Sequence, residues 1–232
     1  MNNPDRDNRP PPGWMRLAEL AALGPRMWRG IGHNGPRGPI GGAPALVIPG
    51  FIASDAATKE LRRALGAAGY RVHPWRMGWN MGARADTIAR LQHALDLVGD
   101  DSPVLLVGWS LGGVFARELA RAVPHRVRAV VTLGSPFSGD PRLNNVWRLY
   151  ERIAGHPVDR PPVERIFAKP PVPTLAIWSR RDGIVAPAAA RGEDGERDAA
   201  VEVDSTHMGF GVSRRATRQV VREIDTFLKW HA

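Results

Sequence analysis

The chain of 232 residues is long enough for one large domain with a substantial core, and 43% of its residues are hydrophobic. It has no run close to the roughly 18 apolar residues that a membrane span requires, and the lack of cysteine excludes disulfides and thiolate chemistry. The net charge of +9 comes mainly from arginines spread along the chain, since only three of the 32 basic residues are lysines. We therefore expect a solvated arginine-rich surface and no nucleic-acid partner. The alternative is weak attraction to anionic surfaces or substrates.

The N-terminal part of the chain reads differently from the rest. Residues 1–13 are polar and proline-rich, which predicts a disordered tail. Residues 14–44 are expected to form an amphipathic helix over 14–28 and then a glycine- and proline-rich connector. We expect this helix to pack against the domain; contact with a membrane surface is the alternative. The polar start, with no apolar stretch behind it, predicts no signal peptide and a cytoplasmic location.

Residues 45–232 alternate between short apolar runs and amphipathic segments. The helices are expected at 56–68, 84–98, 114–122 and 213–230. The strands are expected at 45–48, 70–73, 104–107, 127–133, 173–178 and 200–203. Strands that alternate with helices imply right-handed βαβ units. The predicted fold is therefore α/β, with a mostly parallel central sheet covered by helices on both faces.

One long insertion, residues 138–172, interrupts this alternation. Its first half carries apolar side chains at helical spacing, and its second half is rich in proline. The helical stripe consists of Leu143, Val146, Trp147, Tyr150 and Ile153. Long excursions from a compact α/β core often cover a binding site, so we expect a lid-like element. A purely structural excursion is the alternative.

The most informative motif is Gly108-Trp109-Ser110-Leu111-Gly112, which directly follows the strand at 104–107 and opens a helix. A turn from strand to helix within about two residues leaves no room for side chains beside the serine, which explains the flanking glycines. The context of strand, turn and helix predicts that Ser110 is a nucleophile.

From about Ala45 onward the sequence resembles the α/β-hydrolases of the serine esterase and lipase type. The resemblance rests on five stretches: Pro49-Gly50-Phe51, Gly108 to Gly113, Leu133 to Gly139, Arg181 to Val185, and Ser205-Thr206-His207. It implies the α/β-hydrolase fold and hydrolysis of carboxylic esters through an acyl-enzyme, without a metal or organic cofactor. One departure is Pro49, which stands where small lipases usually carry a histidine. The same fold also hosts acyltransferases and thioesterases, and a non-catalytic binding domain is a further alternative.

The family's chain order of serine, acid and histidine selects Asp182 and His207. Both follow predicted strands, so they should reach the same sheet edge as Ser110. A histidine accepts the serine's proton, and an acidic partner holds its tautomer. Asp204 lies too close to His207 in sequence to approach it from a separate loop, and His73 precedes the serine.

The remaining site residues should hold the oxyanion and the substrate. The backbone N–H groups of Phe51 and Leu111 are the expected oxyanion donors, because they follow the Pro49-Gly50 turn and the nucleophile. Trp109, Trp147 and Tyr150 are expected to contact the substrate. The only partner that the sequence predicts is a small acyl ester; it leaves the oligomeric state open.

Overall fold

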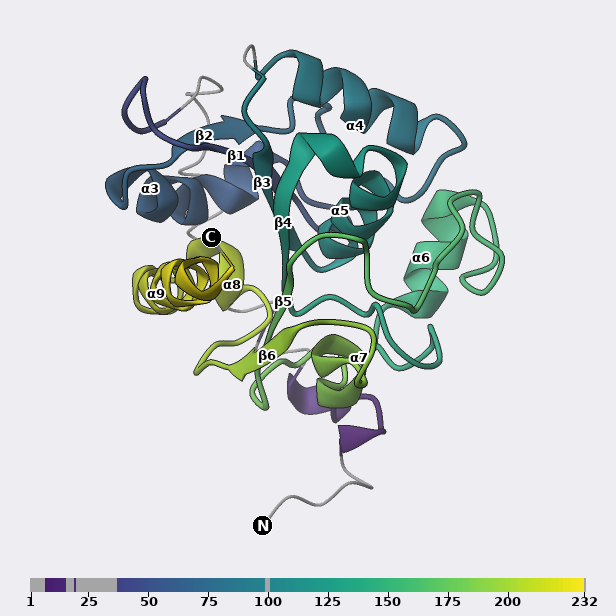
Figure 1. The fold of residues 1–232 in the computed structure, drawn as a ribbon. Coiled ribbons are helices and arrows are strands. Elements are labelled where there is room, and N and C mark those ends of the chain that lie inside the picture. Colours follow the sequence, from purple (N-terminus) through teal and green to yellow (C-terminus); the bar gives the residue numbers. More distant parts are fainter. Residues whose placement is uncertain (1–6, 16–18, 20–36, 99–100, 232) are drawn as a thin grey trace.

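The computed structural model describes residues 7–15, 19, 37–98 and 101–231. Its centre is a six-stranded sheet in the order β2-β1-β3-β4-β5-β6, and every neighbouring pair is parallel (Figure 1). The strands are β1 (Pro44–Ile48), β2 (Arg71–Pro74), β3 (Val104–Trp109), β4 (Val127–Leu133), β5 (Thr174–Trp178) and β6 (Ala199–Glu202). All the expected strands are therefore present, and the predicted α/β fold is confirmed.

Helices fill the connections between the strands. They are η2 (Asp55–Thr58), α3 (Lys59–Ala67), α4 (Thr87–Asp96), α5 (Leu111–Ala122), η3 (Pro124–Arg126), α6 (Trp147–Ala154), α7 (Pro187–Arg191), α8 (Gly209–Val212) and α9 (Arg214–Trp230). Local signals set some of their ends. Ser213 caps α9 by accepting a hydrogen bond from the Ala216 N–H, and α6 ends at Gly155 in a left-handed conformation. The helix expected over 56–68 is divided into the 3-10 helix η2 and α3.

The sheet is covered on both faces. Helices α3, α8 and α9 lie on one face, and α4 and α5 lie on the other (Figure 1). Side chains alternate along each strand. In β3, Leu105 and Val107 therefore pack toward α3 and α9, whereas Leu106 packs toward α4 and α5. This two-sided burial explains why the central strands are continuous apolar runs. In the part of the chain that the structure describes, no helix is both long and apolar enough to cross a membrane.

Residues 7–13, the described part of the expected tail, contact the domain. Asp7 is buried and pairs with Arg180 at 3.2 Å and with Arg191 at 3.8 Å. The Asn145 side chain donates a hydrogen bond to the Pro11 carbonyl. Residues 7–13 are therefore held against the domain rather than disordered. Residues 1–6 and most of the helix expected over 14–28 lie outside the described residues.

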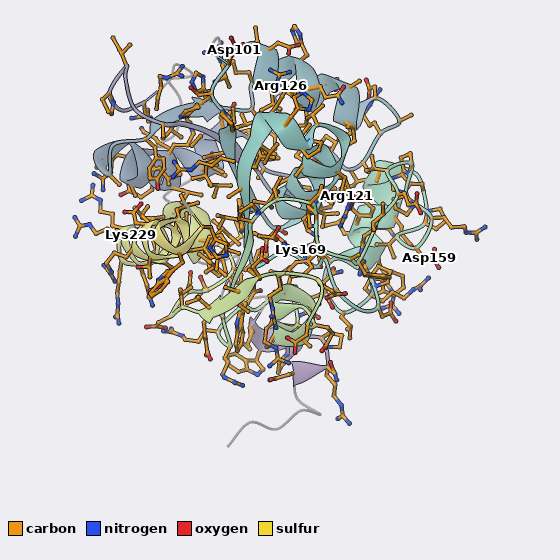
Figure 2. The ribbon with its side chains drawn as sticks, viewed as in Figure 1. Asp101, Arg121, Arg126, Asp159, Lys169 and Lys229 are labelled. Atoms are coloured by element: carbon orange, nitrogen blue, oxygen red, sulfur yellow. The ribbon has the colours of Figure 1, made fainter. Side chains whose placement is uncertain are left out.

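The arginines are not all part of a solvated surface. Charged side chains do lie around the outside of the molecule, such as Lys229 on α9 and Asp159 in the loop after α6 (Figure 2). Arg62 and Arg117, however, are each only 1% exposed. Arg62 donates to the Asp55 carbonyl, and Arg117 donates to the carbonyls of Phe167, Ala168 and Glu196. These two guanidinium groups therefore bind backbone segments together inside the domain.

Candidate active site

Ser110 stands at the sharp turn between β3 and α5. Its backbone has φ 54° and ψ −124°, a conformation that costs a non-glycine residue about 1–3 kcal/mol. Its N–H donates to the Leu133 carbonyl at 2.9 Å, which fixes the turn against β4. The turn is so tight that a Cβ on Gly108 would lie 2.3 Å from the Gly112 carbonyl oxygen. The backbone is therefore strained at Ser110 itself, the residue whose hydroxyl lies at this turn.

Asp182 and His207 form a buried pair at the carboxyl edge of the sheet. His207 Nδ1 lies 2.8 Å from Asp182 Oδ2, and the two residues are 4% and 2% exposed. The other carboxylate oxygen, Oδ1, accepts hydrogen bonds from the N–H groups of Ile184 and Val185, both at 2.8 Å. Because both oxygens are engaged, the carboxylate has a fixed orientation. With its Nδ1 proton donated to Asp182, His207 keeps a free lone pair on Nε2.

Two residues join this pair to the Ser110 turn. Trp109, next to the serine, donates its indole Nε1–H to the His207 carbonyl at 3.0 Å. Gly134 follows β4 with φ 53°, and a Cβ there would lie 2.7 Å from Asp182 Oδ2 and 3.3 Å from His207 Nδ1. The ends of β3, β4, β5 and β6 therefore meet around one site. Asp204 instead faces solvent, where it pairs with Arg181 at 2.7 Å and with Arg215 at 3.3 Å.

The electrostatic environment of His207 favours its charged form. Burial alone would lower the pKa of its imidazole, since a charge is costly away from water. The negative charge and hydrogen bond of Asp182, together with the charge of Glu19, outweigh this effect and raise the pKa of His207 above its ordinary value. The site can therefore accept a proton on this imidazole.

The loop after β1 lies against the serine. A Cβ on Gly50 would come 3.0 Å from Ser110 Cβ, so the backbone of this loop passes directly beside the nucleophile turn. Asn80 holds the loop: its side chain donates to the Pro49 carbonyl at 2.8 Å, and its own carbonyl accepts from the Ile52 N–H at 2.8 Å. Between these bonds, the Phe51 N–H has no hydrogen-bond partner among the described residues.

A cavity opens in front of Ser110. Its volume is about 700 Å³ including the open mouth, and apolar side chains make up most of its wall. The loop after β1 contributes Phe51, and α5 contributes Leu111, Val114 and Phe115. The insertion supplies the facing wall, including Val146, Trp147, Tyr150, Val158, Pro161 and Val163. Of Ser110, Asp182 and His207, only the serine lines this cavity.

Tyr150 connects the insertion to the rest of the cavity wall. Its ring packs edge-on against Phe51, with 5.1 Å between the ring centroids. Its hydroxyl accepts a hydrogen bond from the Ala83 N–H at 3.1 Å, in the loop after β2. Burial raises the pKa of this phenol, so the hydroxyl remains protonated at neutral pH. Tyr150 therefore connects α6 to the loops that follow β1 and β2.

The rest of the insertion is tied to the domain at both ends. Near its start, the Asn145 N–H donates to the Ile184 carbonyl and the Leu143 carbonyl accepts from the Ala186 N–H. Near its end, Arg117 and Arg121 of α5 donate to carbonyls of the segment 166–169. In this structure the insertion is thus a fixed wall that closes one side of the cavity.

Trp109 and Glu19 differ from what the sequence predicts. Trp109 is expected to contact the substrate, but it is 2% exposed and packs into the core on the α3 and α9 face, so this prediction is wrong. Glu19 was not singled out, yet its buried carboxylate accepts hydrogen bonds from the N–H groups of Gly183, His207 and Met208. No local pattern in the sequence links Glu19 to partners so distant in the chain. Trp147 and Tyr150 do line the cavity.

The described residues contain no group of three or more histidine, aspartate or glutamate side chains that could hold a metal ion.

The chain matches a family model and a curated relative. A family model described as the alpha/beta hydrolase fold matches residues 28–155. Lipase LipV of Mycobacterium tuberculosis is 33% identical over 108 residues, which are 47% of this chain and 31% of that protein. The chain thus matches less than a third of the length of this relative.

Solved structures share the fold at low sequence identity. Naproxen esterase from Bacillus subtilis has a TM-score of 0.61 and 16% identity, over 82% of this chain and 85% of that chain. The thioesterase domain from the curacin biosynthetic pathway has a TM-score of 0.57 and 16% identity, over 81% of this chain and 93% of that chain. At this level of identity, both likenesses concern the fold.

Proposed function

Because the chain belongs to the alpha/beta hydrolase family, we propose that it is a serine hydrolase that cleaves carboxylic esters through an acyl-enzyme. The observation that carries the proposal is the position of Ser110. It stands in a strained turn with φ 54°, its side chain faces an apolar cavity, and the buried His207–Asp182 pair lies at the same sheet edge. Strain of this kind persists where the surrounding structure enforces it, as at many active sites.

In the proposed reaction, Ser110 Oγ attacks the ester carbonyl carbon while His207 Nε2 takes the hydroxyl proton. His207 then returns this proton to the leaving alcohol oxygen, and the acyl group remains on the serine. Water attacks the acyl-enzyme by the same route and releases the acid. Asp182 keeps the proton of His207 on Nδ1 and stabilises the imidazolium, a role supported by the 2.8 Å contact between the two side chains.

The N–H groups of Phe51 and Leu111 are the proposed donors to the oxyanion. Leu111 is the first residue of α5, and the first N–H groups of a helix have no partner inside it. The Phe51 N–H belongs to the loop that lies against Ser110 and is held there by Asn80. Two fixed donors at the carbonyl oxygen stabilise the tetrahedral intermediate more than the substrate.

The cavity in front of Ser110 is the proposed acyl site. Its walls are mostly hydrophobic, as the walls of small-ligand sites usually are, and Ser110 lies in this wall. Such a wall favours an apolar acyl chain over a charged one. The insertion 138–172 supplies Trp147 and Tyr150 to this wall, so we expect it to limit the length of the acyl chain rather than to take part in the chemistry.

Labelling with a fluorophosphonate probe and turnover of p-nitrophenyl esters test the proposal. The native protein should react with the probe and hydrolyse the esters. Ser110→Ala should abolish labelling and lower turnover by on the order of 10⁶-fold, because the covalent intermediate is lost. Ser102→Ala, at an exposed position two residues before β3 and thus at the end of this strand away from Ser110, is the control and should retain both. Labelling that survives in Ser110→Ala would assign the nucleophile to another residue.

A further inference from the structure

Glu19 places a buried carboxylate between the two loops that carry Asp182 and His207. Its side chain comes from the N-terminal segment, and the residue is only 2% exposed. Oε1 accepts hydrogen bonds from the N–H of Gly183 at 3.1 Å and from the N–H of His207 at 2.6 Å. Oε2 accepts from the N–H of Met208 at 3.0 Å. One side chain thus binds the residue next to the acid and the histidine itself.

This arrangement fixes the relative position of the two loops. The Asp182–His207 contact spans residues that are 25 positions apart, and the loops follow two different strands, β5 and β6. A single oxygen atom that accepts from both Gly183 and His207 holds the two backbones at a set distance. Hydrogen bonds to a carboxylate are about twice as strong as those between neutral groups, so this link resists separation of the loops.

We propose that Glu19 is a positioning residue for the catalytic pair: it joins the Asp182 and His207 loops and adds a second negative charge that favours the protonated imidazole. This inference rests on the proposed function of the site. Glu19 touches neither the substrate cavity nor the serine in the described structure, so its effect reaches the reaction through His207.

The charge of Glu19 acts in the same direction as that of Asp182. Among the residues that the structure describes, the charged side chains that act on His207 are Asp182 from the loop after β5 and Glu19 from the N-terminal segment, and both raise the pKa of the imidazole. Trp109, which packs against the ring from β3, carries no charge. The Arg181–Asp204 ion pair lies on the same two loops but faces solvent.

The described residues before Glu19 contact the domain at several points. Asp7 pairs with Arg180, and the Pro11 carbonyl accepts from Asn145. At Gly183 the segment is so close that a Cβ would lie 2.8 Å from the Met15 carbonyl oxygen. Asp7 therefore offers a matched control, because it anchors the same segment without contact to Asp182 or His207.

The native chain and the variants Glu19→Gln, Glu19→Ala and Asp7→Asn test the proposal. Glutamine is nearly isosteric with glutamate, but it removes the charge and turns an amide donor toward the Met208 N–H. Glu19→Gln should lower kcat on a short p-nitrophenyl ester by about tenfold to a hundredfold with little change in KM, because small displacements of catalytic groups cost this much. Its acidic limb of kcat/KM should also move to lower pH. Asp7→Asn should leave kcat and the limb nearly unchanged.

Titration of His207 by NMR in the Ser110→Ala background gives a readout that needs no activity. The pKa of His207 should fall when Glu19→Gln is added, since a stabilising negative charge is gone. An unchanged His207 pKa in folded Glu19→Gln would overturn the proposal, and so would an Asp7→Asn variant that loses as much kcat. If Glu19→Ala fails to fold, the His207 pKa and the kcat of Glu19→Gln still test the proposal. Failure of the proposed function itself would show separately, as activity and labelling that survive in Ser110→Ala.

Discussion

The Ser135 hydroxyl occupies the space that a side chain at Gly113 would need: a Cβ on Gly113 would lie 2.0 Å from Ser135 Oγ and 2.8 Å from Ser135 Cβ. Gly113 belongs to the first turn of α5, and Ser135 follows β4. The contact packs the start of the helix behind the nucleophile directly onto the neighbouring strand end. It therefore leaves the start of α5 no room for an added side chain and no room to move closer to this strand end.

Gly113→Ala should therefore destabilise the protein and displace the nucleophile turn. Overpacking of a tight contact typically lowers the free energy of unfolding by about 1–3 kcal/mol, which urea denaturation would measure. The double variant Gly113→Ala/Ser135→Gly should recover part of the loss, because the colliding side chain is gone. Gly41→Ala is the control, since a Cβ there meets nothing within 4 Å. Equal stability of Gly113→Ala and Gly41→Ala would show that the contact is not as tight as described.

Asp182→Asn should lower turnover by roughly 10⁴-fold with the fold intact, as the equivalent change does in a well-studied triad where it produces the wrong histidine tautomer. Steady-state kinetics and circular dichroism would check the two parts of this prediction. Asp204→Asn provides the comparison, because Asp204 faces solvent and pairs with Arg181 and Arg215. A large loss in Asp204→Asn together with an active Asp182→Asn would move the acidic role to Asp204.

Activity should fall as the pH drops through the pKa of His207, because only the neutral imidazole accepts the serine proton. Asp182 and Glu19 raise this pKa above its ordinary value. The acidic limb of kcat/KM should therefore lie above about pH 6.5, the usual value for histidine. A pH profile on a neutral ester measures it, and His93→Gln, at an exposed position of α4, should leave it unchanged. A limb well below pH 6.5 would contradict this account of the site.

Trp147→Ala/Tyr150→Ala should change the preference for acyl length. Both side chains line the cavity, and loss of contact with about two methylene groups at roughly 0.8 kcal/mol each raises KM for long esters about tenfold. Turnover of an acetyl ester should change little, because that substrate does not reach this wall. Tyr150→Phe keeps the ring and loses only the hydroxyl that accepts from Ala83, so its length preference should stay native. An equal loss on both esters would indicate a structural role for the insertion.

The fold could be predicted from the sequence because its strands are unusually clear. The run from Val104 to Val107 is apolar throughout, as a strand covered on both sides must be. Helix ends are harder to predict, since a 3-10 turn and an α-helix have similar apolar spacing; for this reason the sequence predicts η2 and α3 as one helix. The extra helices α7 and α8 are only five and four residues long, too short to show a periodicity.

The candidate site was only partly predictable. Asp182 and His207 each follow a strand of the parallel sheet, and the chain order that the resemblance implies selects them, so their contact could be expected from these two arguments together. Trp109 was predicted to contact the substrate because it is next to the serine. Side chains alternate along β3, however, so Trp109 points into the core on the same sheet face as Leu105 and Val107. Asn80 and Glu19 act on backbone groups far away in the chain. Hydrogen bonds of that kind leave no periodicity or motif in the sequence.

The bond from His207 to Glu19 joins residues 188 positions apart, so its two partners leave the ribosome at very different times. At about 5–20 residues per second, this interval is roughly 10–40 s. For most of this interval the glutamate has none of its three N–H partners, because Gly183 is made 164 residues after it and His207 and Met208 follow later. A nascent chain that already contains the serine turn and the first four strands would therefore still lack the assembled pair of Asp182 and His207.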